Sequence, residues 1–341
     1  MSPLFVLPAA ALLLTFFGHL AALKVFPKLG LLDFPERYGH KRARLPYPTG
    51  IIASLTFAVL FAIAVPLHGV ELGVLIGILS LAIMNLIDDR SPLPFRLRLS
   101  VQLVVCVLIF AAGTRIYTIT NPFGGLLKLD TVDMPGGVFG PLPLFSGIFT
   151  VGWLLLTINA MNWFDGIPGQ VSILSTIGFT MLGLLALLRN GQPEVAMIAF
   201  TLAAIALACC CFDFPPGKVL MGDSGSMFFG LMLGVLGVYQ GGKVATAFLA
   251  IGIPLIDAAF VIVSRMLRGS SPFKGGRDHL HHLLLARGWS ARSVVLFTAV
   301  ISTAFGASAL YMNTAQKGIA AVALLVVVTA VSVYAKRKTR T

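Results

Sequence analysis

The sequence has little charge, and this shortage narrows what the protein can be. Only 11% of its 341 residues are charged, whereas 57% are hydrophobic. A soluble globular domain carries about a quarter charged residues, so most of this chain must face lipid or buried protein. The same apolar excess excludes disordered and collagen-like proteins. The sequence therefore indicates an integral membrane protein.

Cysteine is also scarce, which excludes a disulfide framework. Three of the four cysteines, Cys209, Cys210 and Cys211, are consecutive within an apolar run and are expected to pack as small apolar side chains. The 25 basic residues outnumber the 13 acidic ones and give a net charge of +12. In a membrane protein this excess indicates positively charged inner loops and contact with the anionic lipids of the bilayer. We expect no nucleic-acid partner.

Eleven stretches are apolar enough to cross a bilayer, which requires about 20 mainly apolar residues per helix. The expected spans are residues 3–23, 50–67, 70–87, 99–113, 145–161, 171–188, 195–212, 225–239, 244–263, 293–312 and 317–335. No soluble domain and no internal repeat stand apart from them. We therefore expect an all-α, polytopic bundle of about eleven transmembrane helices, with residues 1–341 forming a single membrane-embedded domain.

The basic residues predict how this bundle is oriented. With the N-terminus outside, most Lys and Arg residues lie in connections on the inner side, as the positive-inside rule requires, and the C-terminus is cytoplasmic. The one long outer connection, residues 114–144, combines Pro and Gly turn residues with short β-prone stretches. This pattern predicts a small external hairpin.

Acidic residues are rare, yet several stand at the inner ends of expected spans. Asp88 and Asp89 end the third span. The helix dipole already places negative charge at that end, so two more anions need a basic neighbour such as Arg90 or a divalent metal ion. Asp223 stands where the chain enters the eighth span, and it can cap that helix or hold a hard metal ion. Asp257 is the exception, because it lies within the ninth span.

Two further polar segments belong to the same side. The fifth span ends with Asn159, Asn162 and Asp165. The two amides share one helix face because they are three residues apart, so they can orient phosphates, hydroxyls or metal-bound water, or simply cap the helix. The loop after the ninth span contains Arg277 and three of the six histidines.

This histidine loop admits several chemistries. Clustered imidazoles beside an arginine can bind a diphosphate, transfer protons near neutral pH or ligate a transition metal. Zinc is the weaker alternative, because no cysteine lies nearby in the sequence. In the expected topology, all four polar segments reach one membrane face, where they can form one site.

The four segments, taken in order, resemble the polyprenyl-phosphate N-acetylhexosamine-1-phosphate transferases, which are polytopic membrane enzymes. The matching segments are Asp88-Asp89, Asn159-x-x-Asn162-x-x-Asp165-Gly166, Gly222-Asp223-Ser224-Gly225-Ser226 and His279-Leu280-His281-His282. The last is similar to the form found in N-acetylglucosamine-type members. Pro168 departs from the family pattern, because it stands where a second acid is usual.

The resemblance implies transfer of an N-acetylhexosamine 1-phosphate, most simply that of N-acetylglucosamine, from a UDP-N-acetylhexosamine to a polyprenyl phosphate such as undecaprenyl phosphate, with release of UMP. It implies an active site on the cytoplasmic face of a bacterial or archaeal cytoplasmic membrane, where the product initiates a cell-envelope glycan. A homodimer is left open.

The resemblance also implies roles for individual residues. The catalytic candidates are Asp88, Asp89 and Asp165; Asp88 accepts a proton from the lipid phosphate or, alternatively, an aspartate forms a covalent phosphosugar. Mg²⁺, with Mn²⁺ as the alternative, is expected on Asp223, Asp88 and Asp89. The residues expected to bind the substrates are Asn159, Asn162, Arg277, His279, His281 and His282. The competing interpretations are a secondary transporter of an anion and, because of Pro168, a catalytically impaired family member.

Overall fold

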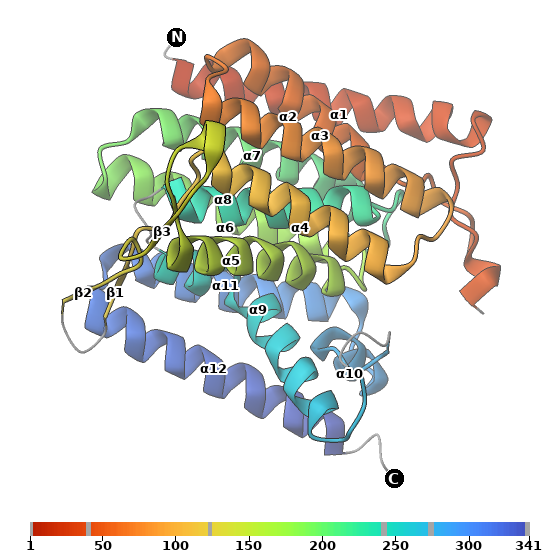
Figure 1. Cartoon of the computed structure of the whole chain (residues 1–341). Coiled ribbons are helices and arrows are strands. Elements are labelled where there is room, and N and C mark those ends of the chain that lie inside the picture. Colours follow the sequence, from red (N-terminus) through yellow and green to blue (C-terminus); the bar gives the residue numbers. More distant parts are fainter. Residues whose placement is uncertain (1–2, 39–41, 122–124, 240–243, 272–275, 338–341) are drawn as a thin grey trace.

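A computed structural model shows a bundle of helices that run side by side, with short strands at one end (Figure 1). It describes residues 3–38, 42–121, 125–239, 244–271 and 276–337. The α-helices are α1 (Pro3–Lys28), α2 (Gly50–Ala64), α3 (Gly69–Arg90), α4 (Phe95–Ala111), α5 (Leu144–Trp163), α6 (Gln170–Arg189), α7 (Pro193–Asp213), α8 (Asp223–Tyr239), α9 (Val244–Met266), α10 (Leu280–Ala286), α11 (Ala291–Tyr311) and α12 (Thr314–Arg337). Two short 3₁₀ helices are η1 (Pro35–Tyr38) and η2 (Gly137–Phe139).

Each expected span corresponds to an α-helix, so the prediction of an all-α membrane bundle is confirmed. Within the described residues, eight helices are long and apolar enough to cross a bilayer: α1, α3, α5, α6, α7, α9, α11 and α12. Helices α2 and α8 are apolar but shorter. Helix α4 carries Arg96 and Arg98 in its first turn. Helix α10 was not predicted, because it is a single short segment within the histidine loop.

The long connection between α4 and α5 forms two small hairpins. Strand β1 (Thr118–Thr120) pairs antiparallel with β2 (Leu126–Lys128), and β3 (Asp133–Met134) pairs antiparallel with β4 (Leu142–Pro143). These pairs confirm the predicted hairpin and add a second, although residues 122–124 lie outside the described chain. The strands and α10 lie at opposite ends of the bundle (Figure 1). The histidines are therefore on the face opposite to the hairpins.

Helix α8 lies at the centre of the bundle, and its residues from Ser224 to Val238 are buried. It crosses α5 closely at Gly230, where a Cβ atom would stand only 2.6 Å from the carbonyl oxygen of Thr157. A larger side chain would force the two helices apart, because packed interiors leave no room to absorb it. This close crossing holds the C-terminal end of α5 and the N-terminal end of α8, with their polar residues, next to each other.

Helix α9 is bent. Ile251 departs from helical geometry with φ −119° and ψ 21°, and Pro254 follows in the next turn. Proline lacks the N–H group that the helix ladder needs, which explains a bend at this point. Beyond the bend, α9 carries Asp257 and Arg265 toward the histidine loop and packs against α12.

Candidate active site

The C-terminal end of α3 and the N-terminal ends of α4 and α8 meet at one arginine. Arg98 of α4 places Nη1 2.9 Å from Oδ2 of Asp88 and Nη2 2.7 Å from Oδ2 of Asp223. Asp88 lies in the last turn of α3, and Asp223 is the first residue of α8. One guanidinium therefore joins two carboxylates that are far apart in the sequence.

Arg98 is a site residue that was not predicted, because it was counted only among the basic residues that indicate orientation. The basic neighbour expected for the acid pair, Arg90, is exposed. Arg98 is only 26% exposed, and an arginine in an otherwise apolar helix needs anionic partners. This need for anionic partners could have indicated a role for Arg98, but the sequence does not show which acidic residues pair with it.

Asn162 joins the same cluster from α5. Its Nδ2 donates to Oδ1 of Asp223 over 2.9 Å and to Oγ of Ser226 over 3.1 Å, while its Oδ1 accepts from Arg98 over 3.4 Å. Asn159, one turn earlier, donates to Oε1 of Gln102 over 2.8 Å. The two amides have different partners: Asn162 belongs to the acid cluster, and Asn159 extends the polar surface toward Gln102.

Asp89 has a separate set of partners, at the amino end of α8. Its carboxylate accepts from the backbone N–H of Asp223 over 3.0 Å and of Ser224 over 3.1 Å. The hydroxyl groups of Tyr47, over 2.6 Å, and Ser224 also donate to it. Asp89 thus caps α8 from a neighbouring helix and complements its positive dipole end. A metal-binding or catalytic role would require this carboxylate to exchange those partners.

Asp165 lies in the connection between α5 and α6, close to other acidic side chains. Burial raises the pKa of Asp165 well above its ordinary value, and the charges of Asp213, Asp223 and Asp89 add to the rise. These electrostatic neighbours come from α3, α7 and α8. Asp165 therefore belongs to the acid-rich region, as predicted, although no direct contact joins it to Arg98 within the described residues.

A buried aspartate fixes the histidine loop. Oδ2 of Asp257 in α9 lies 2.7 Å from Nδ1 of His279, and Oδ1 accepts the backbone N–H of Leu280 over 2.7 Å. Asp257 is 1% exposed, so these contacts are shielded from water. They fix both the start of α10 and the orientation of the His279 ring, leaving Nε2 as the nitrogen that can meet a substrate.

His281 packs against His279, with ring centroids 6.0 Å apart, and against His282, with centroids 4.1 Å apart. His281 is completely buried, and a Cβ atom at Gly166 would stand 1.9 Å from its Nε2, so only glycine fits there. Burial lowers the pKa of His281 well below its ordinary value, with smaller effects from His282 and His279. Burial, His279 and Arg277 also lower the pKa of His282. Both rings are therefore neutral at pH 7 and add no charge to the site.

The rest of the loop is only partly described. Arg277 is exposed, and its effect on the pKa of His282 indicates that it lies near the histidines. Asp278 pairs with Arg265 of α9, with Nε and Oδ2 3.3 Å apart. Residues 272–275 lie outside the described chain. The described part links the loop to α9 twice, through Asp257 and through Arg265.

A groove of about 520 Å³ joins the acid cluster to the histidines. The predicted site residues that line it are Asn159, Asn162, Asp223, His279 and His282, together with Arg98 and Gln102. Its apolar walls are formed by Phe95, Leu99, Leu155, Leu156 and Ile262. Five other predicted residues lie outside its lining: Asp88, Asp89, Asp165, Arg277 and His281. The structure thus gathers one set of predicted residues at the groove and places another set around it.

The carboxylates suit a metal ion that needs few protein ligands. Within the described residues, no group of three or more His, Cys, Asp or Glu side chains is arranged to hold a metal ion. Mg²⁺ commonly uses only one or two carboxylates and takes its other ligands from phosphate groups and water. Asp88 and Asp223 fit this pattern, because their oxygens already approach one cationic group.

Comparison with known proteins connects these features to a family. The model of glycosyl transferase family 4 matches residues 71–241, which include α4 to α8 and most of α3. A probable undecaprenyl-phosphate N-acetylglucosaminyl 1-phosphate transferase of Bacillus subtilis (strain 168) is 28% identical over 70% of this chain and 65% of its own length. The undecaprenyl-phosphate alpha-N-acetylglucosaminyl 1-phosphate transferase of Yersinia pestis is 30% identical over 81% of this chain and 76% of its own. The chain thus spans just under two thirds of the Bacillus relative.

Proposed function

Because the chain belongs to glycosyl transferase family 4, we propose that it transfers N-acetylglucosamine 1-phosphate from UDP-N-acetylglucosamine to undecaprenyl phosphate and releases UMP. The relatives at 28–30% identity carry names that describe this transfer. The observation that carries the proposal is one groove that combines a cationic and imidazole-lined end with long apolar walls.

The groove suits a reactant with a phosphate head and an isoprenoid tail. Phe95 is 51% exposed and Leu156 is 38% exposed on its walls, so in a membrane these side chains face lipid. A polyprenyl tail is too long for an enclosed pocket and needs a path that opens to the bilayer. With the tail on these walls, the phosphate would reach Arg98 and His279 at the polar end.

Charge neutralisation is the main physical demand of the reaction, since both reactants are anions. Asp223 and Asp88 would hold Mg²⁺, which when bound neutralises the diphosphate and the charge that develops on the UMP leaving group. The Arg98 guanidinium would bind phosphate oxygens, and His279 and His282 would donate N–H hydrogen bonds to them. Asn162 would keep Asp223 oriented through the hydrogen bond described above.

The bond changes follow from this placement. An oxygen of the lipid phosphate forms a bond to the phosphorus that carries the sugar. The bond from that phosphorus to the bridging oxygen breaks, and its electron pair leaves with UMP. We assign Asp88 as the group that accepts any proton on the lipid phosphate. In the alternative, an aspartate attacks first and the lipid phosphate then displaces it.

We place this face of the protein toward the cytoplasm of a bacterial cytoplasmic membrane, with the N-terminus outside. The support is the excess of basic residues in the connections on this face. A transporter is disfavoured, because transporters bind substrates near the midplane, whereas these acids stand at helix ends and Asp257 is paired with His279.

UMP release by the purified protein tests the proposal. With undecaprenyl phosphate and Mg²⁺, a panel of UDP-sugars should yield UMP from UDP-N-acetylglucosamine, with the signal lost in EDTA and restored by added Mg²⁺. If UMP were released from a different UDP-N-acetylhexosamine instead, the proposed reaction would stand, but the proposed sugar would be wrong. No UMP from any UDP-sugar would favour a catalytically impaired member.

The same assay without acceptor lipid separates the two routes. A burst of UMP in the parent protein that is absent from Asp88→Asn would support the covalent route through Asp88. Direct attack predicts that UMP appears only when undecaprenyl phosphate is present.

A further inference from the structure

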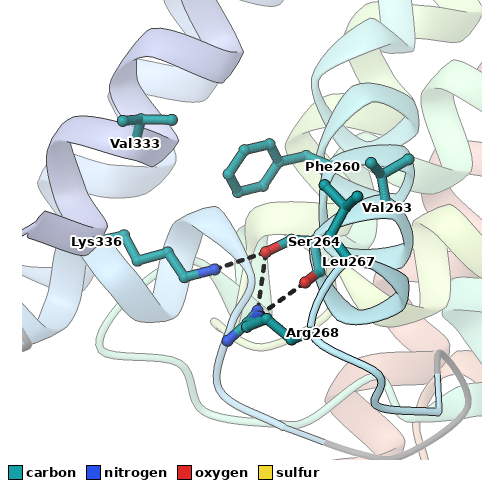
Figure 2. A pocket seen from close by; sticks show the side chains of 7 residues that line it. All are labelled: Phe260, Val263, Ser264, Leu267, Arg268, Val333 and Lys336. Atoms are coloured by element: carbon teal, nitrogen blue, oxygen red, sulfur yellow. Dashed lines mark hydrogen bonds between the residues drawn. The ribbon is translucent and has the colours of Figure 1, made fainter.

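A second groove lies between α9 and α12 (Figure 2) and has a different composition. Its volume is about 380 Å³, and its lining consists of Phe260, Val263, Ser264, Leu267, Arg268, Val333 and Lys336. No Asp or Glu is among these residues. The groove is therefore apolar along most of its length and basic at one end.

The two basic side chains converge on a single hydroxyl group. Lys336 Nζ and Arg268 Nη2 each donate to Oγ of Ser264 over 2.8 Å, one from α12 and one from just beyond α9 (Figure 2). The Ser264 hydroxyl group cannot neutralise the charge of the Arg268 guanidinium. Among the described residues, Arg268 forms no salt bridge. Arg268, with the ammonium group of Lys336 on the same hydroxyl, therefore gives this end of the groove a positive potential that attracts an anion.

The apolar part of the groove faces the surrounding lipid. Leu267 is 83% exposed and Val263 is 54% exposed. Val333 also lines a further apolar groove of about 660 Å³ along α12, together with Leu325, Val326, Thr329, Ala330 and Tyr334. A lipid chain whose head meets the basic end can therefore continue along α12.

The spacing along α9 separates this groove from the active-site groove. Phe260, Val263, Ser264 and Leu267 recur at intervals of three and four residues and form one helix face. Ile262 and Arg265 line the active-site groove instead. The two grooves thus lie on different faces of the same helix, and only the active-site groove contains a carboxylate and imidazoles.

We propose that the α9–α12 groove binds an anionic glycerophospholipid from the leaflet on the active-site side. Its phosphate lies between Arg268 and Lys336, and one acyl chain passes Val333 toward Leu325. The groove offers neither carboxylates for a metal ion nor imidazoles for a diphosphate. This composition favours a phosphodiester lipid over the polyprenyl phosphate assigned to the other groove.

Native mass spectrometry of delipidated protein in a neutral detergent tests the proposal, with dioleoyl phosphatidylglycerol as the probe. Arg268→Gln combined with Lys336→Gln should weaken its binding at least about tenfold, since each basic residue near a membrane surface attracts anionic lipid. The matched control is Lys24→Gln combined with Lys28→Gln, which removes the same charge from exposed positions at the end of α1. It should change the affinity less than about twofold.

Other probes identify the source of the phosphate group. Val333→Trp fills the groove without changing charge and should also weaken phosphatidylglycerol binding, provided that the variant elutes as a monodisperse peak. Equal phosphatidylglycerol binding by the parent and the Arg268–Lys336 variant would overturn the proposal. Displacement of the bound lipid by inorganic phosphate, or by undecaprenyl phosphate more readily than by phosphatidylglycerol, would overturn it as well.

Discussion

Two ionic clusters meet at the active-site groove, and they are built for different tasks. Around Arg98, two carboxylates share one partly exposed guanidinium, so their partners can be exchanged for a metal ion or a phosphate. Around Asp257, a carboxylate that is almost inaccessible holds one imidazole and one backbone N–H. Partly exposed, shared contacts suit ligand binding, whereas fully buried contacts suit positioning.

Asp223→Asn tests the exchangeable cluster and should have the largest effect. Replacing this carboxylate by an amide removes a predicted Mg²⁺ ligand, so kcat/KM for UMP release should fall by about 10³-fold. Asp133→Asn, in the β3–β4 hairpin at the other end of the bundle, is the matched control and should retain parental activity. If Asp223→Asn retained most of its activity at every Mg²⁺ concentration, the Arg98 cluster would not be the metal site.

Asp257→Asn tests the positioning cluster and should cost less, about 10-fold to 100-fold in kcat. The amide can still contact His279, but it no longer favours the ring orientation that the carboxylate fixes. The kcat of Asp257→Asn should be compared with that of His279→Gln and with that of the double variant that carries both substitutions. Because Asp257 acts through His279, the double variant should be no slower than His279→Gln, and a multiplicative loss would contradict the positioning role.

Arg98→Gln should lower the stability of the fold modestly, and Mg²⁺ should partly restore that stability. Without the guanidinium, Asp88 and Asp223 repel each other, and the free energy of unfolding should fall by roughly 1–3 kcal/mol. Mg²⁺ should then raise the thermal midpoint of Arg98→Gln more than that of the parent, because the cation compensates the two acids. Arg96→Gln, at an exposed position two residues away, should show the parental response.

The comparison of the clusters also shows what sequence can and cannot reveal. Long apolar runs predicted the helices, because a run of about 20 mainly apolar residues is the main requirement for a spanning helix. The interval of three residues placed Asn159 and Asn162 on one face of a helix, and both lie in α5. The pairings of Arg98 and Asp257 depend on residues from other helices, so no local pattern identifies them. Asp88 and Asp89 are neighbours with similar sequence surroundings, yet the packing of α3 against α4 pairs Asp88 with Arg98, and its packing against α8 gives Asp89 a different set of partners.

The smallest predicted effect concerns pH and the buried His281. Burial lowers the pKa of His281 in the folded protein, whereas an unfolded histidine titrates near 6.5. As the pH falls below about 6.5, the unfolded state takes up a proton that the folded state resists, so stability declines by up to about 1.4 kcal/mol per pH unit. His281→Gln should unfold with a shallower dependence between pH 7 and 5, even if it is less stable at pH 7.

A matched control makes this pH test specific. His68 is exposed at the start of α3, and His68→Gln should keep the parental slope when the thermal midpoint is followed across the same range. Equal slopes for the parent and His281→Gln would mean that His281 is already accessible to protons in the folded state. The histidine loop would then resemble the exchangeable cluster around Arg98, and the distinction between the two ionic clusters would rest on Asp257 alone.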